Sequence, residues 1–180
     1  MSLLQRIVAG LLLSAAASIA VAQDQGLTGT FDTDFNQRPW AEFASHLPKF
    51  PDAADLAEIH VEGEQDTRFY VDLASIDLGP DAIIRYTLLT RSASGAESLT
   101  YEGLRCFSAE RKLYAFGRKD RSWDKALSSR WIPIVLNASV NSYHAALYLK
   151  YFCKLHAPLA SREILVDTIK KGGLPPEKNY

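Results

Sequence analysis

The side chains with the clearest capacity for chemistry lie in or near the stretch AIIRYTLLTRSASGAESLTYEGLRC, residues 82–106. These candidate binding residues are charged or aromatic: Arg85, Tyr101, Glu102, Arg105 and Trp131. Together they could form a polar patch that binds a peptide, a glycan or another envelope component. The simpler interpretation is an Arg85–Glu102 ion pair across two strands, with aromatic packing around it. We assign none of the five a catalytic role.

The sequence predicts no metal site and no cofactor. DTDFN (32–36) begins like a calcium-binding loop, but Gln37 and Phe43 stand where that loop needs its glycine and its bidentate glutamate. Zinc sites commonly combine closely spaced histidines and cysteines, and neither H-x-x-x-H nor C-x-x-C occurs. The four histidines are His46, His60, His144 and His156. On one helix, the last two would lie about 120° out of line.

Motifs that define common catalytic sites do not occur either. The sequence contains no G-x-S-x-G, no phosphate-binding P-loop and no dinucleotide-binding glycine pattern. A Ser-His-Asp triad stays open, because such triads are assembled in space rather than along the chain. One further alternative is a Cys153 nucleophile with His156 as its base, one helical turn away.

The N-terminus predicts export. Arg6 precedes an apolar run over residues 7–17, which closes on Ala20-Val21-Ala22, the small-x-small pattern that signal peptidase cleaves. The alternative is a membrane anchor, but the run is short for a span and is diluted by alanine and serine. We therefore expect a cleaved signal peptide over residues 1–22, a periplasmic protein, and no stable membrane insertion after cleavage.

The two cysteines, Cys106 and Cys153, are expected to form a structural disulfide, because a lone pair of cysteines usually closes in an oxidising compartment. For an enclosed loop of about 47 residues, chain entropy predicts about 4 kcal/mol of stabilisation, less any strain. A metal site or a reactive thiol is the alternative. The formal net charge of −1 offers no basic excess for nucleic acid.

These candidate residues are positioned by an expected β-hairpin. Its loop is predicted at Ser92–Gly95, where Gly95 is free to adopt a positive φ. That loop places Tyr86 opposite Tyr101 and Arg85 opposite Glu102. A two-residue loop would instead break the Arg85–Glu102 charge pair, so we prefer the first register.

Strand patterns dominate the first part of the chain, and helix patterns the last. Strands are expected at 56–63, 68–78, 111–118 and, at an edge because of Pro133, 130–136. A short helical turn is expected at 39–51, packed over a sheet edge through Trp40, Phe43 and Leu47.

Helices are expected over 141–156 and 161–173. Asn141 or Ser142 would cap the first, and Ser161 and Gly172 would bound the second. One face of the first would carry Ala145, Leu149, Phe152, Cys153 and His156. The predicted fold is α+β: an antiparallel sheet covered on one face by C-terminal helices, with one helix-to-sheet disulfide. Residues 23–39 are predicted to be an irregular polar arm, and 40–180 a single domain.

A fixed order of motifs supports this arrangement. VD (71–72), the block from RYT (85–87) through SGAE (94–97) to YEGLRC (101–106), YAFGR (114–118) and HAALYLKYFC (144–153) resemble the cryptic neisserial protein-like family of exported proteins. The resemblance extends from about Trp40 to Gly173. It implies a secreted or periplasmic location and a shared disulfide, and it implies no activity.

The function predicted from these observations is a non-catalytic binding or envelope-support domain, with an envelope protein, peptide or glycan as its partner. The alternative is a small periplasmic hydrolase that acts on envelope material through acid and base groups assembled by the fold. A pocket with two carboxylates, or with a carboxylate and a histidine within hydrogen-bond reach, would favour the enzyme. An exposed apolar patch or an unpaired sheet edge would favour the binding domain.

Overall fold

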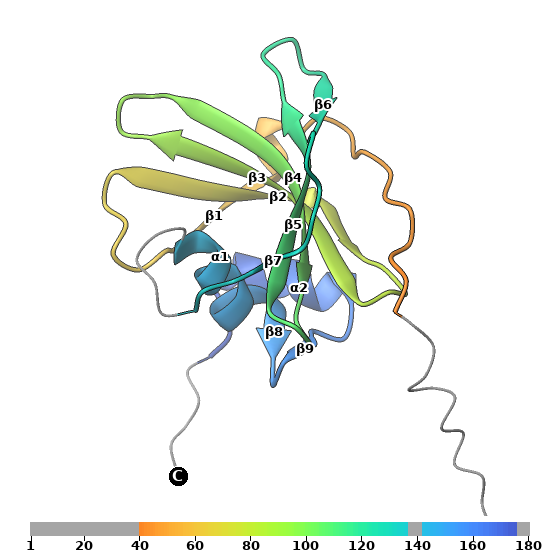
Figure 1. Ribbon diagram of the computed structural model, residues 1–180. Coiled ribbons are helices and arrows are strands. Elements are labelled where there is room, and N and C mark those ends of the chain that lie inside the picture. The colour runs from red at the N-terminus through yellow and green to blue at the C-terminus, as the bar shows by residue number, and fades with distance from the viewer. Residues whose placement is uncertain (1–39, 137–141, 176–180) are drawn as a thin grey trace, which may run out of the picture. The chain divides into compact units, whose positions relative to one another are not determined.

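A computed structural model describes residues 40–136 and 142–175. The predicted signal peptide and polar arm, and Asn141 as a helix cap, lie outside these residues. The main sheet is antiparallel, in the order β1-β2-β3-β4-β5-β6, with β7 paired to β5 (Figure 1). Its strands are β1 (Leu56–Ile59), β2 (Thr67–Leu78), β3 (Ile83–Ser92), β4 (Glu97–Arg105), β5 (Glu110–Gly117), β6 (Trp123–Lys125) and β7 (Ile132–Pro133).

The remaining elements are a short 3-10 turn η2 (Ala53–Asp55), helices α1 (Ser142–Ala146), η3 (Leu147–Phe152) and α2 (Arg162–Lys170), and the small ribbon β8 (Cys153–Lys154) with β9 (Ala157–Pro158). The C-terminal helices cover one face of the sheet (Figure 1). The α+β prediction is therefore confirmed. In the part of the chain that the structure describes, no helix is both long and apolar enough to cross a membrane.

Period-two alternation along β3 and β4 separates the two faces of the sheet. Apolar side chains on the helix-covered face form the core with the C-terminal helices; the tyrosine ring of Tyr86, for example, lies 5.0 Å from that of Phe152. The fully buried members of this core include Ile84, Tyr86, Leu88, Leu104, Leu147, Phe152 and Leu165. Side chains at the intervening positions, such as Arg85 and Tyr101, belong to the opposite face.

The predicted register of the β3–β4 hairpin is wrong by one residue. Tyr86 pairs with Glu102, and Arg85 pairs with Gly103. The cause is the loop: the Ser92 N–H donates to the Ala96 carbonyl (2.9 Å), so the loop contains three residues, and Gly95 closes it with φ +82°. A one-residue change exchanges the faces of one strand relative to the other. Arg85 and Glu102 therefore lie on opposite faces and cannot form an ion pair.

The predicted helix over 141–156 ends earlier, at Phe152. Its second part, η3, has π-helix geometry, and Cys153 is already extended at φ −119° and ψ 143°. Because a π-helix is wider than an α-helix, the 3.6-residue spacing no longer predicts which side chains share a face. Leu149, expected in the core, is 52% exposed. His156 lies beyond the helix in a tight turn, with φ +61°.

The second helix agrees with its prediction. The Ser161 hydroxyl accepts a hydrogen bond from the Ile164 N–H (3.4 Å), which caps the start of α2. Gly172 follows the end of the helix with φ +81°, the left-handed conformation that commonly stops a helix.

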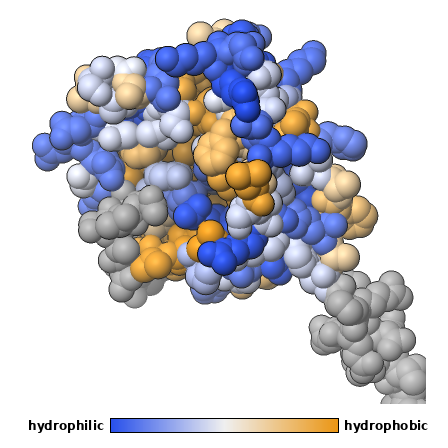
Figure 2. Space-filling model, turned by 45° about the horizontal axis from the view of Figure 1, so that its top comes forward, coloured by the Kyte–Doolittle hydropathy of each residue, from blue (hydrophilic) through white to orange (hydrophobic). Residues whose placement is uncertain are grey.

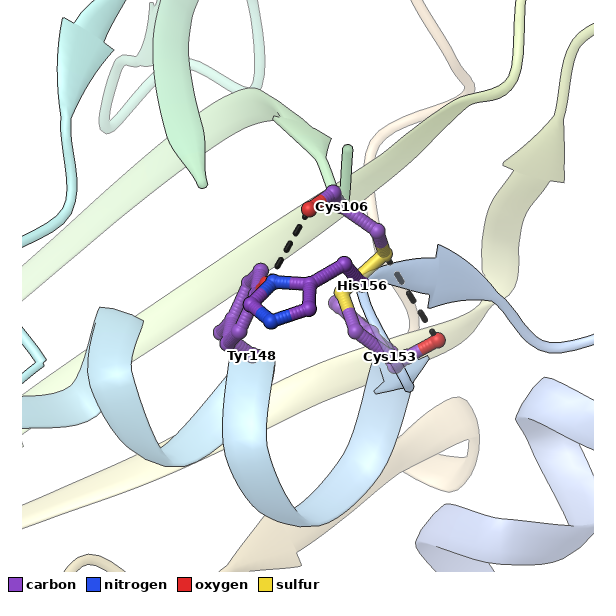
Figure 3. Close-up of a disulfide and its surroundings, with 5 residues drawn as sticks. Cys106, Tyr148, Cys153 and His156 are labelled. Atoms are coloured by element: carbon purple, nitrogen blue, oxygen red, sulfur yellow. Dashed lines mark hydrogen bonds between the residues drawn. A yellow bond between two sulfur atoms is a disulfide. The ribbon is translucent and has the colours of Figure 1, made fainter. Parts of the chain in front are cut away.

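The disulfide between Cys106 and Cys153 is confirmed, with 5.6 Å between the two Cα atoms. It joins the residue after β4 to the residue after η3, and so ties the helical layer to the sheet (Figure 3). The Tyr148 hydroxyl donates to the Cys106 carbonyl (3.0 Å) and lies 2.8 Å from Nδ1 of His156. His156 therefore contacts a tyrosine, and Cys153 is bonded to Cys106, so a Cys153–His156 nucleophile is ruled out in this state.

Candidate functional site

Residues 40–52, which we call the strap, cross the face of the sheet opposite the C-terminal helices (Figure 1). The prediction of a helical turn at 39–51, packed over an edge, is wrong: the strap has no helix from Trp40 to Asp52. Its backbone groups bind sheet side chains instead of one another. The Phe43 N–H donates to Asp81 (2.9 Å), and the Phe43 carbonyl accepts from Arg85 (3.1 Å).

Glu42 anchors the first part of the strap. Its carboxylate accepts hydrogen bonds from the ammonium of Lys112 (2.7 Å), the hydroxyl of Tyr114 (2.7 Å) and the indole N–H of Trp131 (3.2 Å). Burial works to raise the pKa of Glu42, but these donors and the Lys112 charge outweigh it and hold the pKa below its usual range. Glu42 is therefore ionised at neutral pH and stabilises the folded state there.

We expect Glu42→Gln to lower the free energy of unfolding by about 1 kcal/mol, because the amide retains one acceptor but loses the charge that Lys112 and Tyr114 face. Urea unfolding at pH 7 measures this loss. The control is Glu58→Gln, which removes an exposed pair with Arg68 and should change stability by less than about half as much. Equal effects of the two substitutions would contradict the anchoring role.

A buried ion pair between Arg85 and Asp81 lies beneath the strap. Two nitrogens of the guanidinium donate to the carboxylate at 3.1 and 2.7 Å, and both side chains are almost fully buried. Burial opposes ionisation of Asp81, but Arg85 and the backbone N–H of Phe43 hold its pKa below the ordinary value. Gly79 permits this pair, since a Cβ there would collide with Asp81 Oδ1 and Arg85 Nη1.

A cavity of about 520 Å³ opens between the strap, β2 and the start of α2. Carboxylates from Asp52, Asp55, Asp72 and Asp77 line it, together with the imidazole of His46 and the polar side chains of Arg85, Tyr101 and Arg162. A volume of this size lies in the range of small-molecule sites. On the face of the molecule shown in Figure 2, exposed hydrophobic residues lie in small groups among hydrophilic ones.

An irregularity in β2 shapes one wall of the cavity. Asp72 pairs with Thr87 and Asp77 with Arg85, so residues 73–76 all bulge opposite a single residue of β3. β1 ends its pairing at Asp72, so the carbonyls of the bulge have no partner in β1. The Arg162 guanidinium supplies donors to the carbonyls of Leu73, Ala74 and Ile76, at 3.0, 3.4 and 2.8 Å.

Asp72 lies at the start of this bulge and is buried. Burial raises its pKa, and the negative charges of Asp55 and Asp52 add to the rise, against hydrogen bonds from the Ala74 N–H and Ser75. The Ala74 bond is 3.0 Å long. A buried carboxylate with a raised pKa at a cavity wall is a recognised feature of functional sites.

Tyr101 contributes a hydroxyl to the cavity. The residue is only 3% exposed, and its ring packs against those of Tyr114 and Trp123, with centroids 5.4 and 6.2 Å away. Within residues 40–136 and 142–175, the Tyr101 hydroxyl makes no hydrogen bond. Burial, together with the nearby Asp77 charge and despite Arg85, raises the pKa of Tyr101 to about 12. The hydroxyl is thus a protonated, unused donor at neutral pH.

The guanidinium of Arg105 contacts two tryptophan rings, those of Trp40, the first residue of the strap, and of Trp131, which precedes β7. It is 3.7 Å from the ring centroid of Trp40 and 5.2 Å from that of Trp131, and it pairs with Glu110 at 2.9 Å. The Trp40 N–H donates to the Asp81 carbonyl (3.1 Å). These cation–π and hydrogen-bond contacts hold the strap against the sheet.

Glu102 lies on the opposite face of the sheet, in the core beneath the C-terminal helices. Its carboxylate accepts from the Tyr86 hydroxyl (3.0 Å) and the Thr100 hydroxyl (2.8 Å), and lies 2.8 Å from Nε2 of His144. Burial works to raise the pKa of Glu102, but His144 and the two hydroxyls hold it below its usual range. Glu102 and His144 are each less than 5% exposed, so no ligand from solvent reaches them.

The five candidate residues therefore separate into three environments. Arg85 and Tyr101 line the cavity, Arg105 and Trp131 form the aromatic cluster that anchors the strap, and Glu102 lies in the core. Sequence reasoning missed the acidic residues of the cavity, Asp52, Asp55, Asp72 and Asp77, and also Arg162. Two of them carried a signal: aspartate is depleted in strands, yet Asp72 and Asp77 both interrupt the predicted strand 68–78.

Together, these features define a small α+β domain with one meandering antiparallel sheet, a disulfide-tethered helical layer and a cavity beneath an N-terminal strap. The model of the CNP1-like family matches residues 35–170, and this chain belongs to that family. It is also 29% identical, over 150 residues, to Cryptic neisserial protein 1 of Neisseria gonorrhoeae, which covers 74% of this chain and 73% of that protein. No solved structure matches the chain.

Proposed function

We propose that this protein is a periplasmic binding domain that holds a small polar ligand, from a peptide or a glycan of the cell envelope, in the cavity beneath the strap. The observation that carries the proposal is the Tyr101 hydroxyl, which lines the cavity and makes no hydrogen bond among the described residues, although the residue as a whole is only 3% exposed. Because ring packing against Tyr114 and Trp123 fixes this hydroxyl at the cavity wall, it is a preformed donor that a ligand in the cavity can use. The predicted signal peptide supports the location.

The substitution Tyr101→Phe tests this proposal. We expect about a tenfold loss of ligand affinity, because one hydrogen bond is lost, and a change in stability of less than about 0.5 kcal/mol, because the free protein makes no bond with that hydroxyl. The matched control is Tyr148→Phe, which loses the bond to the Cys106 carbonyl and should lower stability without changing affinity. Native mass spectrometry of unreduced protein from the periplasm supplies the ligand, and calorimetry measures its affinity.

If Tyr101→Phe binds that ligand as tightly as the wild type, the cavity is not the binding site. A chain that is recovered with residues 1–22 attached would contradict the proposed location.

A hydrolase remains the second candidate, and one observation favours it. Asp72, whose pKa is raised by burial, shares the cavity with other aspartates and with His46, the residue types that general acid–base catalysis uses. Hydrolysis of envelope peptides or glycans by the wild type but not by Asp72→Asn would establish this activity. Turnover that is unchanged in Asp72→Asn would exclude Asp72 as its acid.

A further inference from the structure

The cavity has an excess of negative charge that the described residues do not neutralise. Of the four lining aspartates, Asp52 pairs with Arg121 at 3.1 Å. Neither Asp55 nor Asp77 has a side-chain hydrogen bond or ion pair within residues 40–136 and 142–175. The negative charges of Asp55 and Asp52 help to raise the pKa of Asp72, as expected for carboxylates that line one cavity.

The basic residues of the cavity are already engaged or solvated. The Arg85 guanidinium is neutralised by two bonds to Asp81, and the Arg162 guanidinium donates to the carbonyls of the β2 bulge. Lys49 is exposed to solvent, which screens its charge. The Arg162 charge persists in these hydrogen bonds, but the carboxylates of Asp55, Asp72 and Asp77 outnumber it, so a cation that enters the cavity meets an excess of negative charge.

A second, independent feature indicates that the ligand also carries a hydrogen-bond acceptor. The Tyr101 hydroxyl lines the same cavity, and it is a donor without a partner in the described residues. Its phenol stays protonated at neutral pH, since its pKa is about 12. The ligand must then present an oxygen to Tyr101 while its positive charge faces the aspartates.

A bare metal ion does not fit this site. In the described part of the chain, no three His, Cys, Asp or Glu side chains are grouped closely enough to hold one. Calcium takes six to eight oxygen ligands, and such a shell needs a closer cluster. An organic cation needs only one or two carboxylates and an apolar wall, which Leu47 and Phe50 supply.

We propose that the ligand carries a protonated primary amine, which binds one or two of the carboxylates of Asp55, Asp72 and Asp77, and a carbonyl or hydroxyl oxygen, which accepts from the Tyr101 hydroxyl. This inference rests on the proposed binding function and names the chemistry of its ligand. A lysine side chain within a peptide and an amino sugar both have this chemistry.

Two matched pairs of probes test the amine at pH 7: the tripeptide Gly-Lys-Gly, blocked at both ends, against its Nε-acetyl form, and glucosamine against N-acetylglucosamine. We expect at least one amine to bind about tenfold or more tightly than its acetylated partner, since charge-assisted hydrogen bonds contribute about 1.5–3 kcal/mol. Chemical-shift titration measures the affinities. The pair that shows the difference identifies the ligand as peptide or amino sugar.

Substitutions of the cavity aspartates test whether the difference in affinity between the amine and acetylated probes arises in the cavity. Asp77→Asn should weaken amine binding about tenfold and reduce its dependence on salt, and it should fold because Asp77 is exposed. Asp55→Asn is the second variant. Asp167→Asn, on the exposed surface of α2, is the control and should bind as the wild type does.

The outcomes separate this inference from the proposed function. The proposed amine is wrong if acetylated probes bind as tightly as amines, or if only neutral ligands bind and lose affinity in Tyr101→Phe. In either case the proposed binding function stands. If neither these probes nor the periplasmic extract yields a ligand whose affinity depends on Tyr101, both fail. An amine preference that Asp77→Asn and Asp55→Asn leave unchanged would also overturn the inference.

Discussion

We expect Glu102→Ala to lower the free energy of unfolding by about 3–5 kcal/mol, because it leaves the side chains of Tyr86, Thr100 and His144 without their buried acceptor. The carboxylate is the acceptor for two hydroxyls and the partner of His144. Nδ1 of His144 is itself buried without a hydrogen bond among the described residues, so the ring depends on the contact between Nε2 and Glu102. Denaturant unfolding at pH 7 measures the loss.

The pH dependence of stability provides a second measurement of the same pair. Because the folded pKa of Glu102 lies below its ordinary value, its contribution is fully present above pH 4.5 and is lost as the pH falls through the folded pKa. Glu102→Ala should therefore lose less stability than the wild type on acidification. The control is Glu97→Ala on the same strand, which removes only an exposed pair with Arg91 and should cost about 0.2–1 kcal/mol. If Glu102→Ala is no more destabilising than this control, the buried pair contributes nothing.

Arg85→Met should also cost about 3–5 kcal/mol, because it leaves the Asp81 carboxylate buried without its cation. The loss should extend to the strap, since Arg85 donates to the Phe43 carbonyl and Asp81 accepts from the Phe43 N–H. We therefore expect faster hydrogen exchange at the Phe43 amide than in the wild type, even under conditions in which the variant is folded. Unfolding experiments and amide exchange measure the two effects.

The matched control is Arg91→Met, six residues further along β3. Arg91 is 45% exposed and pairs with Glu97, so its loss should cost about 0.2–1 kcal/mol and leave the Phe43 amide unchanged. Protection of that amide in Arg85→Met equal to that in the wild type would show that the strap is held without the ion pair.

Strong local patterns predicted the elements, but not the contacts between them. Alternating strands, a Ser161 cap and a lone cysteine pair were sufficient for the α+β fold and the disulfide, which the structure confirms. The predicted register was wrong because the hairpin loop contains three residues, the last of which is Gly95, and not four. The apparent charge pair between Arg85 and Glu102 had favoured the longer loop. Arg85 and Glu102 look complementary in the sequence, yet Arg85 pairs with Asp81, in the turn just before β3, and Glu102 pairs with His144 of α1.

The candidate site was predicted only in part for a related reason. Arg85 and Tyr101 were recognised because they lie in a regular hairpin, whereas the other walls of the cavity come from irregular segments. The strap has no periodic pattern, and the bulge from Asp72 to Asp77 interrupts the one that β2 has. Segments held by specific hydrogen bonds rather than by apolar faces leave no periodic signal in a sequence.

The meandering sheet also has a consequence for the order in which the chain can fold. Along the path from β1 to β6 each strand pairs with its neighbour in the sequence, so these hairpins need no residue beyond Lys125. A chain that emerges N-terminus first could assemble this sheet while α1, η3 and α2 are still missing. Its apolar face, with Ile84, Tyr86 and Leu88, would then be uncovered until residues 142–170 arrive. A stalled or truncated chain would thus expose an aggregation-prone surface. Residues 142–170 prevent this by covering the apolar face of the newly formed sheet.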